Sequence, residues 1–308
     1  MGNVLVVGSI NVDYVIHTDR LPRLGETLVG RDFAMNFGGK GANQAVALAK
    51  SGCRVKMLGA VGNDTAGELA IKNLEDCGVD TAAVLRVARP TGAAVITVCD
   101  GDNHIILDAG ANDCITPETV LKNEALFDWA DVLVMQYEIP TPSVLCAAGL
   151  AKSKKKTVIL NPAPAKEVDA ALYALVDWLI PNEFEVQLIT GIEPSSKSET
   201  ARAMAALRQM GCKNAVVTLG KRGCAYHLAD EVAYAGVFPV QSVDTTSAGD
   251  SFIGGFCTAL CDKKDAAEAV LYASAVAAIT VSRAGACVSI PTAAEVREFL
   301  RTNRIEQI

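Results

Sequence analysis

The sequence contains no cysteine pair with the spacing of a metal site. Its ten cysteines are scattered, and none forms a C-x-x-C pair. Cys257 and Cys261 stand four residues apart without a neighbouring histidine, which favours buried helix residues over metal ligands. Scattered cysteines of this kind are typical of a reducing compartment.

The sequence also lacks a long apolar run and a basic excess. Its most apolar long segment, from Ala266 to Val281, contains Glu268 and is too short to cross a bilayer. The first residues carry no basic region and read as a strand rather than a signal peptide. A net charge of −7 offers no general attraction to nucleic acids or membrane surfaces. We therefore expect a cytoplasmic protein without a nucleic-acid or membrane partner.

Aromatic residues are few, at 5%, while half of the residues are hydrophobic and alanine and valine dominate. This composition is typical of helices packed on a parallel sheet. No linker, low-complexity segment or internal repeat divides the chain, so we expect a single α/β domain over residues 1–308. Residues 14–36 differ, because they alternate without a helical period and carry turn residues; they predict a small β flap.

Polar residues follow the ends of several predicted strands. They are Asn11, Glu138, Asn161, Asn182 and Thr218. Each has a plain alternative explanation as a turn residue, a helix cap or a loop acid. Ligands of open α/β sheets bind at the carboxyl ends of the strands, so their shared placement predicts one crevice. Asn11 and Asp13 point to the same side of an extended chain and suit adjacent sugar hydroxyls.

A glycine-rich turn, Gly38-Gly39-Lys40-Gly41, precedes an alanine-rich helix. It has neither the Walker A spacing nor a clean dinucleotide-binding fingerprint, since Gln44 stands where glycine or alanine is wanted. We expect glycines here to let a ligand touch the backbone. The alternative is a tight strand-to-helix turn with no ligand.

A second helix start lies in the segment from Asp244 to Phe252, where Thr246 or Ser247 could act as the cap. Gly249 is unfavourable in a first helical turn unless something must approach the backbone. Free N–H groups at a helix start attract anions, and Asp250 beside them could accept a proton. This combination suits phosphoryl transfer to a hydroxyl. Alternatively, Asp250 is an acidic first-turn residue favoured by the helix dipole.

Six stretches together resemble PfkB-type carbohydrate kinases, and among them the ribokinase group, nearly from end to end. They are Gly8 to Asp13, Gly38 to Ala45, Asn161 to Ala165, Pro181 to Glu185, Thr218 to Gly220 and Asp244 to Asp250. The resemblance implies a ribokinase-like α/β fold with a lid formed by about residues 14–36 and 93–107, and a homodimer contact through that lid.

The resemblance also implies a role for each site residue. The sugar would contact Asn11, Asp13, Gly39, Lys40, Gly41, Asn43, Glu138 and Asp250. Asp250 would be the catalytic base, and Ala248, Gly249 and Asp250 would form the anion hole. The nucleotide, with Mg²⁺, would contact Asn182, Glu185, Thr218, Gly220, Gly223, Gly249 and Ser274. A monovalent cation, usually K⁺, would be held by Asp244, Thr246, Thr280, Arg283, Gly285 and Ser289.

The implied activity is ATP-dependent phosphorylation of the 5-hydroxyl of D-ribose. A kinase for deoxyribose, a nucleoside or a hexose is the alternative within the same chemistry. A non-catalytic sugar- or nucleotide-binding regulator is the alternative of another class, and Asp250 beside an intact Ala248-Gly249 argues against it. Ser274 departs from the family, which often has histidine or asparagine there, near the adenine.

Overall fold

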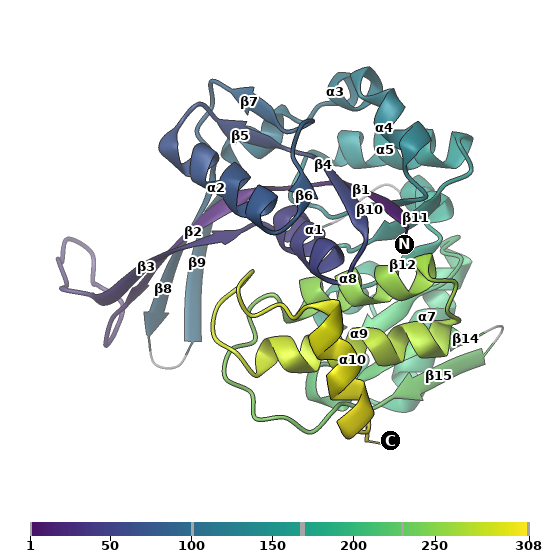
Figure 1. Ribbon diagram of the computed structural model, residues 1–308. Helices are drawn as coiled ribbons and strands as arrows, with labels where there is room; N and C mark the ends of the chain where they lie inside the picture. The colour runs from purple at the N-terminus through teal and green to yellow at the C-terminus, as the bar shows by residue number, and fades with distance from the viewer. Residues whose placement is uncertain (1, 100–101, 167–169, 229–230, 307–308) are drawn as a thin grey trace.

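Six parallel strands form the central sheet of the molecule, in the spatial order β12-β11-β10-β1-β4-β6 (Figure 1). The computed structural model describes residues 2–99, 102–166, 170–228 and 231–306. The strands are β1 (Asn3–Val7), β4 (Arg54–Leu58), β6 (Val79–Asp80), β10 (Val132–Met135), β11 (Thr157–Leu160) and β12 (Trp178–Leu179). The predicted parallel α/β architecture is confirmed. Valine and leucine fill these strands because helices cover both faces of the sheet.

Successive side chains of each strand point to opposite faces of the central sheet. Val4 and Val6 belong to one apolar cluster, whereas Leu5 and Val7 belong to the other. The first face is covered by α1 (Lys40–Lys50), α2 (Thr65–Asp76), α8 (Ala248–Cys261) and α9 (Ala266–Val281). The second is covered by α3 (Pro117–Lys122), α4 (Glu124–Trp129), α5 (Thr141–Ser153), η2 (Ala170–Leu175), α6 (Glu183–Thr190) and α7 (Lys197–Gln209). Helix α10 (Ala293–Thr302) packs against α9.

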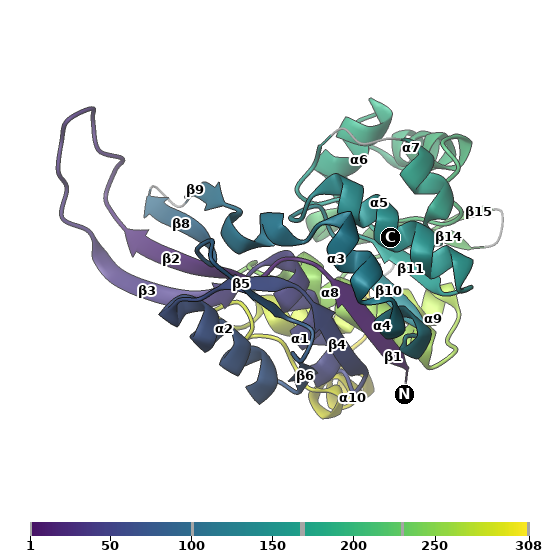
Figure 2. The same ribbon diagram turned by 90° about the horizontal axis from the view of Figure 1, so that it is seen from above.

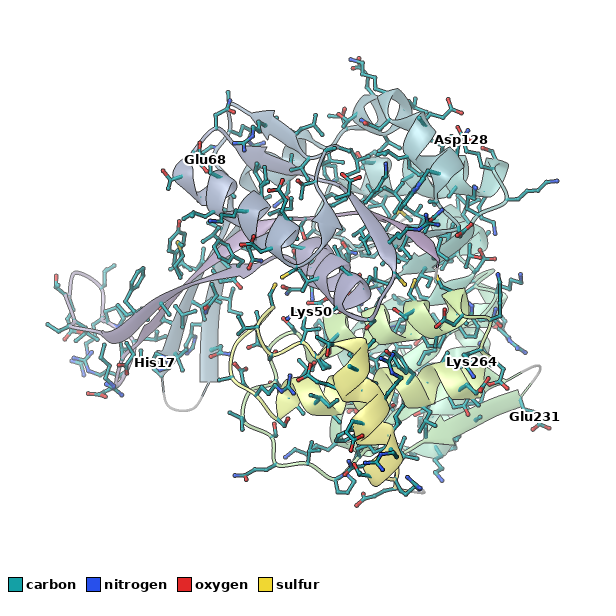
Figure 3. The ribbon with its side chains drawn as sticks, in the orientation of Figure 1. His17, Lys50, Glu68, Asp128, Glu231 and Lys264 are labelled. Carbon is teal, nitrogen blue, oxygen red and sulfur yellow. The ribbon has the colours of Figure 1, made fainter. Side chains whose placement is uncertain are left out.

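A separate sheet in the order β3-β2-β8-β9 projects from the body (Figures 1 and 2). Its strands are β2 (Asn11–His17), β3 (Arg31–Gly38), β8 (Gly92–Cys99) and β9 (Asp102–Asp108). β2 pairs with β3 in antiparallel and with β8 in parallel orientation. His17, at the far end of β2, lies well away from the body (Figure 3). The predicted flap is therefore part of a separate four-stranded sheet. Residues 100 and 101, within the second segment of the implied lid, lie outside the described residues.

The remaining strands form two small sheets. They are β13 (Val216–Thr218), β14 (Cys224–Leu228) and β15 (Glu231–Ala235), and the pair β5 (Ala60–Gly62) and β7 (Leu85–Val87). Bridges from Leu179 to Ala215 and from Asn182 to Thr218 join β13 to the edge of the central sheet. β14 and β15 pair in antiparallel orientation. Short 3-10 turns complete the chain at η1 (Gly110–Cys114) and η3 (Gly220–Arg222).

Two predictions about composition can be compared with the structure. In the described part of the chain, no helix combines the length and the apolar character that a membrane span requires. All ten cysteines are free thiols, and six of them are buried. Cys257 and Cys261 both lie in α8, as predicted; Cys257 is buried, whereas Cys261, the last residue of the helix, is only half-buried.

Candidate active site

Helix α8 begins at Ala248 without a side-chain cap. Ser247 occupies the N-cap position in a left-handed conformation with φ 60°, and its side chain makes no capping hydrogen bond. The prediction that a hydroxyl at residue 246 or 247 caps this helix was therefore wrong. Side-chain capping requires an extended backbone at the N-cap, which Ser247 does not adopt. A Cβ atom placed on Gly249 would meet no atom within 4 Å, so the first turn of α8 has an open side.

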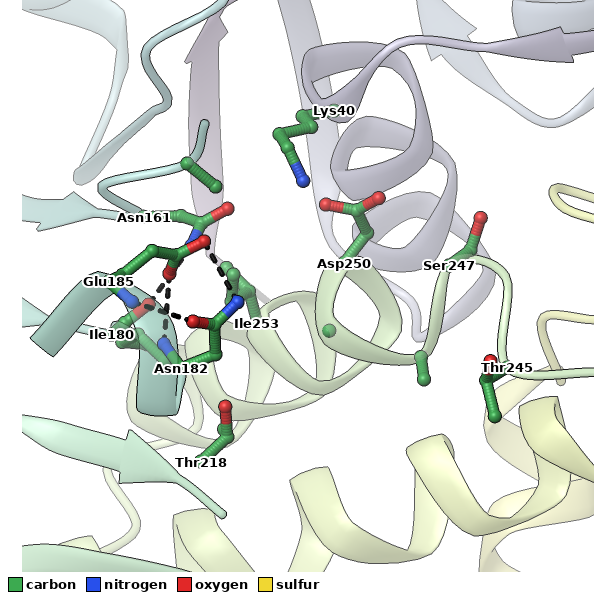
Figure 4. Close-up of a pocket in the computed structure, with 13 residues that line it drawn as sticks. Lys40, Asn161, Ile180, Asn182, Glu185, Thr218, Thr245, Ser247, Asp250 and Ile253 are labelled. Atoms are coloured by element: carbon green, nitrogen blue, oxygen red, sulfur yellow. Dashed lines mark hydrogen bonds between the residues drawn. The ribbon is translucent and has the colours of Figure 1, made fainter. Parts of the chain in front are cut away.

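The open side of α8 faces a cavity of about 230 Å³ (Figure 4). It is lined by Lys40, Asn161, Ala163, Ile180, Asn182, Glu185, Thr218, Thr245, Ser247, Ala248, Gly249, Asp250 and Ile253. Asp250 is only 8% exposed, and the amine of Lys40 points toward its carboxylate in Figure 4. The cavity thus brings a buried acid, a lysine and a helix start together.

Both carboxylate oxygens of Asp250 accept a hydrogen bond from an amide of α1. Asn43 Nδ2 donates to Asp250 Oδ2 at 3.1 Å. Gln44 Nε2 donates to Asp250 Oδ1 at 2.9 Å. A carboxylate oxygen can accept more than one hydrogen bond, so Asp250 keeps capacity to accept a proton from a bound hydroxyl.

The charged groups around the cavity influence one another. Burial opposes the charge of Lys40, but the carboxylates of Asp250, Glu138 and Glu185 together raise its pKa above the ordinary value. Burial, followed by repulsion from Glu138 and Asp250, raises the pKa of Asp13 from 3.8 to about 6. Burial also raises the pKa of Glu185, although a backbone hydrogen bond from Asn182 opposes the shift. The site therefore carries more negative charge than one lysine balances, which suits cationic or hydroxyl-bearing ligands.

Glu138 collects three donors at the end of β10. Its Oε2 accepts from Ser9 Oγ at 2.6 Å, from Lys40 N at 3.1 Å and from Asn11 Nδ2 at 3.3 Å. Asn11 Oδ1 in turn accepts from Asn112 Nδ2 at 2.7 Å. The structure thus brings Asn11 and Glu138 into contact, as their positions after strands predicted.

The glycine-rich turn allows the backbone of residues 8–11 to approach α1 closely. Gly39 has φ 89°, and a Cβ atom there would stand 2.7 Å from the backbone nitrogen of Asn11. A Cβ atom on Gly41 would stand 2.5 Å from the backbone nitrogen of Ser9. The space that a side chain would take at these glycines is filled by residues 8–11 of the chain itself. This packing requires glycine, and the ligand contact at the same turn stays a prediction. Both glycines let α1 start directly beside Asn11.

Asn182 and Glu185 form a reciprocal cap at the start of α6. Asn182 Oδ1 accepts from Glu185 N at 2.9 Å, and Glu185 Oε2 accepts from Asn182 N at 2.9 Å. Both residues line the cavity together with Thr218. Three other predicted nucleotide residues do not line it. They are Gly220 and Gly223, at the turn between β13 and β14, and Ser274, half-buried on α9.

Asp244 joins two loops at the start of α8. Its Oδ1 accepts from Thr246 N at 2.9 Å, and its Oδ2 accepts from Gly285 N at 3.0 Å. Thr280 and Ser289, on either side of Gly285 in the sequence, are buried. Their hydroxyls donate to the carbonyls of Val276 and Ala286. Arg283 instead pairs with Glu295 at 2.7 Å. Within the described ranges, no group of three or more His, Cys, Asp or Glu side chains could hold a metal ion.

Comparison with known proteins identifies the family. The model of the pfkB family carbohydrate kinases matches residues 1–293. The chain belongs to the pfkB family of carbohydrate kinases. It therefore shares its fold and its general chemistry, the phosphorylation of a carbohydrate, with that family.

Individual pfkB kinases extend the comparison. The chain is 39% identical to a ribokinase of Haemophilus influenzae, over 96% of this chain and 97% of the relative. It is 34% identical to a deoxyribokinase of Salmonella typhi, over 98% and 99% of the two chains. The structure of Arabidopsis thaliana ribokinase complexed with ribose and ATP superimposes with a TM-score of 0.93 at 33% identity, over 97% and 99% of the two chains.

Sequence reasoning did not select several buried residues that hydrogen-bond in and around the candidate site. Ser9, Gln44 and Asn112 are buried and hydrogen-bond to predicted site residues. Gln136 is also buried and donates to Gln44. Gln136 does follow a strand end, the signal that selected Glu138 two residues later. Asn112 lies in η1 and carries no such signal, because its contact with Asn11 spans 101 residues of sequence.

Proposed function

We propose that this pfkB kinase transfers the γ-phosphoryl group of ATP to the 5-hydroxyl of D-ribose. The observation that carries the proposal is buried Asp250 at the uncapped, open first turn of α8, inside a cavity shared with Lys40. The ribokinase relatives, including the one bound to ribose and ATP, support the choice of sugar and nucleotide.

Each residue has a role in the proposed transfer. The sugar oxygen attacks the γ-phosphorus, the bond from that phosphorus to the bridging oxygen of ADP breaks, and Asp250 takes the hydroxyl proton. The N–H groups of Ala248, Gly249 and Asp250 offset the charge that develops on the transferred group. Lys40, whose amine points toward Asp250, adds a positive charge at the same place.

Asn11, Asp13 and Glu138 form the proposed sugar side of the site. Asn11 and Glu138 contact each other, and the charge of Asp13 interacts with those of Glu138 and Asp250. The turn over Gly39, Lys40, Gly41 and Asn43 would complete the sugar side. The deoxyribokinase relative supports deoxyribose as a second candidate substrate. A panel of sugars incubated with ATP and scored by ADP release separates the two. We expect the highest kcat/KM with ribose, and a preference for deoxyribose or a hexose would overturn the choice.

The nucleotide would lie toward Asn182, Thr218, Gly220 and Gly223, with the adenine near Ser274. Glu185 offers a buried carboxylate at the edge of the cavity, and oxygen ligands of this kind suit Mg²⁺. Asn182 and Glu185 would hold Mg²⁺ partly through water. When bound with ATP, Mg²⁺ neutralises the phosphate charge that this acidic site would otherwise repel.

The loops joined by Asp244 would hold the proposed K⁺ ion. The oxygen atoms that would act as cation ligands are the Asp244 carboxylate, the buried hydroxyls of Thr280 and Ser289, and carbonyls of the turn from Arg283 to Gly285. Thr246 would add another ligand. A cation here would place positive charge behind the anion hole and order the segment that starts α8.

We expect K⁺ to activate the enzyme more than Na⁺ does, and to raise its melting temperature. The reason is that a larger cation suits a loop site built from several carbonyl and hydroxyl oxygens. Activity and melting temperature are measured in K⁺, Na⁺ and a large organic cation at equal ionic strength. Equal values in all three would remove K⁺ from the proposal.

The projecting sheet would act as a lid and as the contact between two copies of the chain. The face opposite Asp13 exposes Phe33, Met35, Val95 and Ile106, which the strand register places side by side. Contiguous apolar surface of this kind marks an interaction site. The proposed lid covers about residues 14–36 and 93–107 of a single domain, and the protein would work in the cytoplasm.

Ile106→Lys is expected to convert the proposed dimer to a monomer, because Ile106 is 75% exposed on the edge strand β9, beside Val95 of the same apolar face. A buried, unpaired lysine would oppose association. Leu121→Lys on α3 is the matched control, because Leu121 is 56% exposed but lies outside the lid. Light scattering coupled to size exclusion gives the mass of each variant. A wild-type monomer, or an unchanged dimer in Ile106→Lys, would contradict the proposed contact.

A further inference from the structure

A chain of buried amides connects Asp250 to a backbone carbonyl. Asn161 Nδ2 donates to the carbonyl of Ile180 at 3.0 Å. Asn161 Oδ1 accepts from Gln44 Nε2 at 3.2 Å, and the same nitrogen of Gln44 donates to Asp250 Oδ1 at 2.9 Å. Asn161 and Gln44 are both buried, so these amides satisfy one another.

The backbone carbonyl of Ile180 fixes the orientation of each side-chain amide in this row of hydrogen bonds. A carbonyl can only accept, so Asn161 must turn its nitrogen to Ile180 and its oxygen to Gln44. Gln44 must then present its nitrogen to both Asn161 and Asp250. A rotated Gln44 amide would place its oxygen against two other oxygens. The donor that faces Asp250 is therefore determined by the fold itself.

Gln136 holds Gln44 from the other side. Gln136 Nε2 donates to Gln44 Oε1 at 2.6 Å. Gln136 is completely buried, and its own Oε1 has no hydrogen-bond partner in the described part of the chain. A buried oxygen without a partner lowers stability. The hydrogen bond to Gln44, rather than folding stability, therefore accounts for a glutamine at position 136.

The second oxygen of Asp250 is held in a similar way. Asn43 Nδ2 donates to it, and Asn43 Oδ1 accepts from the thiol of Cys287 at 3.2 Å. Burial raises the pKa of Cys287 to about 12, so this thiol keeps its proton and remains a donor. Both sides of the carboxylate are thus fixed by groups that belong to other elements.

We propose that Gln44, Asn161 and Gln136 are positioning residues that hold the Asp250 carboxylate in the orientation needed to take the hydroxyl proton. They link the ends of β10, β11 and β12 to α1 and the first turn of α8. The proposal rests on the proposed function, in which Asp250 is the base. A small displacement of a catalytic group reduces the rate of reaction strongly, while ground-state binding is little affected.

Gln44→Met tests the central link, because methionine has a similar shape and no amide. We expect kcat to fall about 10–100-fold, the effect of losing one hydrogen bond to a charged group. KM for sugar and ATP should stay within about twofold, because no binding contact is removed. Gln136→Met should lower kcat about 3–10-fold alone and have almost no further effect in the Gln44→Met background, because it acts through Gln44.

Thr258→Val is the matched control. Thr258 is a buried polar residue of α8, the helix that carries Asp250. Its hydroxyl donates to the carbonyl of Gly254. This control should lower the melting temperature and leave kcat unchanged. Wild-type kcat in Gln44→Met, or a loss confined to KM, would overturn the positioning role. If Gln44→Met does not fold, Gln136→Met carries the same test. Normal turnover in Asp250→Asn would instead refute the proposed function, so the two failures are distinguishable.

Discussion

Asp250→Asn is expected to reduce kcat by about 10²–10⁴-fold, the usual contribution of a general base. Asparagine keeps the size of the side chain but cannot take the proton of the sugar hydroxyl. The loss should appear in kcat, because the proton moves mainly in the transition state. ATP affinity should hold or improve, because a buried carboxylate has left the cavity that would take the phosphates.

The same variant tests the plainer explanation of Asp250. If the residue only favours the start of α8 through the helix dipole, Asp250→Asn should change stability by less than about 1 kcal/mol and leave turnover normal. Measurements of kcat, ATP affinity and melting temperature separate the two explanations. Turnover within a few-fold of wild type would show that Asp250 is not the base.

Asp13→Ala is expected to raise the KM for the sugar by about 10–100-fold while ATP binding stays normal. The variant leaves a sugar hydroxyl without its partner in a buried site, at a cost of roughly 1–3 kcal/mol for each lost hydrogen bond. Asp13 is partly buried close to Glu138 and far in sequence from the nucleotide residues. Steady-state kinetics with each substrate varied in turn checks this, and an unchanged sugar KM would remove Asp13 from the sugar site.

The pKa of Asp13 also makes a prediction about stability. The pKa of Asp13 is about 6 in the folded protein, whereas its ordinary value, taken for the unfolded chain, is 3.8. Between these pH values the folded state therefore binds more protons than the unfolded state. Stability therefore falls as pH rises from about 4 to 6, and the full penalty persists above that range. Asp13→Asn should melt a few degrees above wild type near pH 8, and this gain should shrink toward pH 5.

Much of the fold could be predicted from local patterns. The strands β1, β10 and β11 are short runs rich in valine, leucine and isoleucine, and α9 begins and ends where its apolar pattern does. Polar residues after strands indicated the correct edge of the sheet because parallel strands end together. One local feature, an acidic residue in the first turn of a glycine-containing helix, suggested Asp250 as a base, and the family resemblance assigned it that role.

Other features depended on contacts that local patterns do not carry. The left-handed conformation of Ser247 removes the expected side-chain cap. The local sequence Thr-Thr-Ser-Ala-Gly does not predict this conformation. The close packing of Gly39 and Gly41 against residues 8–11 was not predicted, because it joins two separate segments of the chain. The hydrogen bond between Gln44 and Asp250 spans 206 residues of sequence and exists only because α1 and α8 pack together.

The most direct test of the proposed activity is the identity of the phosphorylated product. The purified protein is incubated with Mg²⁺-ATP, K⁺ and D-ribose, and the product is analysed by phosphorus and carbon NMR, with 5-deoxyribose as the control sugar. We predict ribose 5-phosphate and ADP in equal amounts, and no phosphorylated product from 5-deoxyribose. Phosphate on another hydroxyl, phosphorylation of 5-deoxyribose, or the absence of any sugar phosphate would contradict the proposed transfer to the 5-hydroxyl.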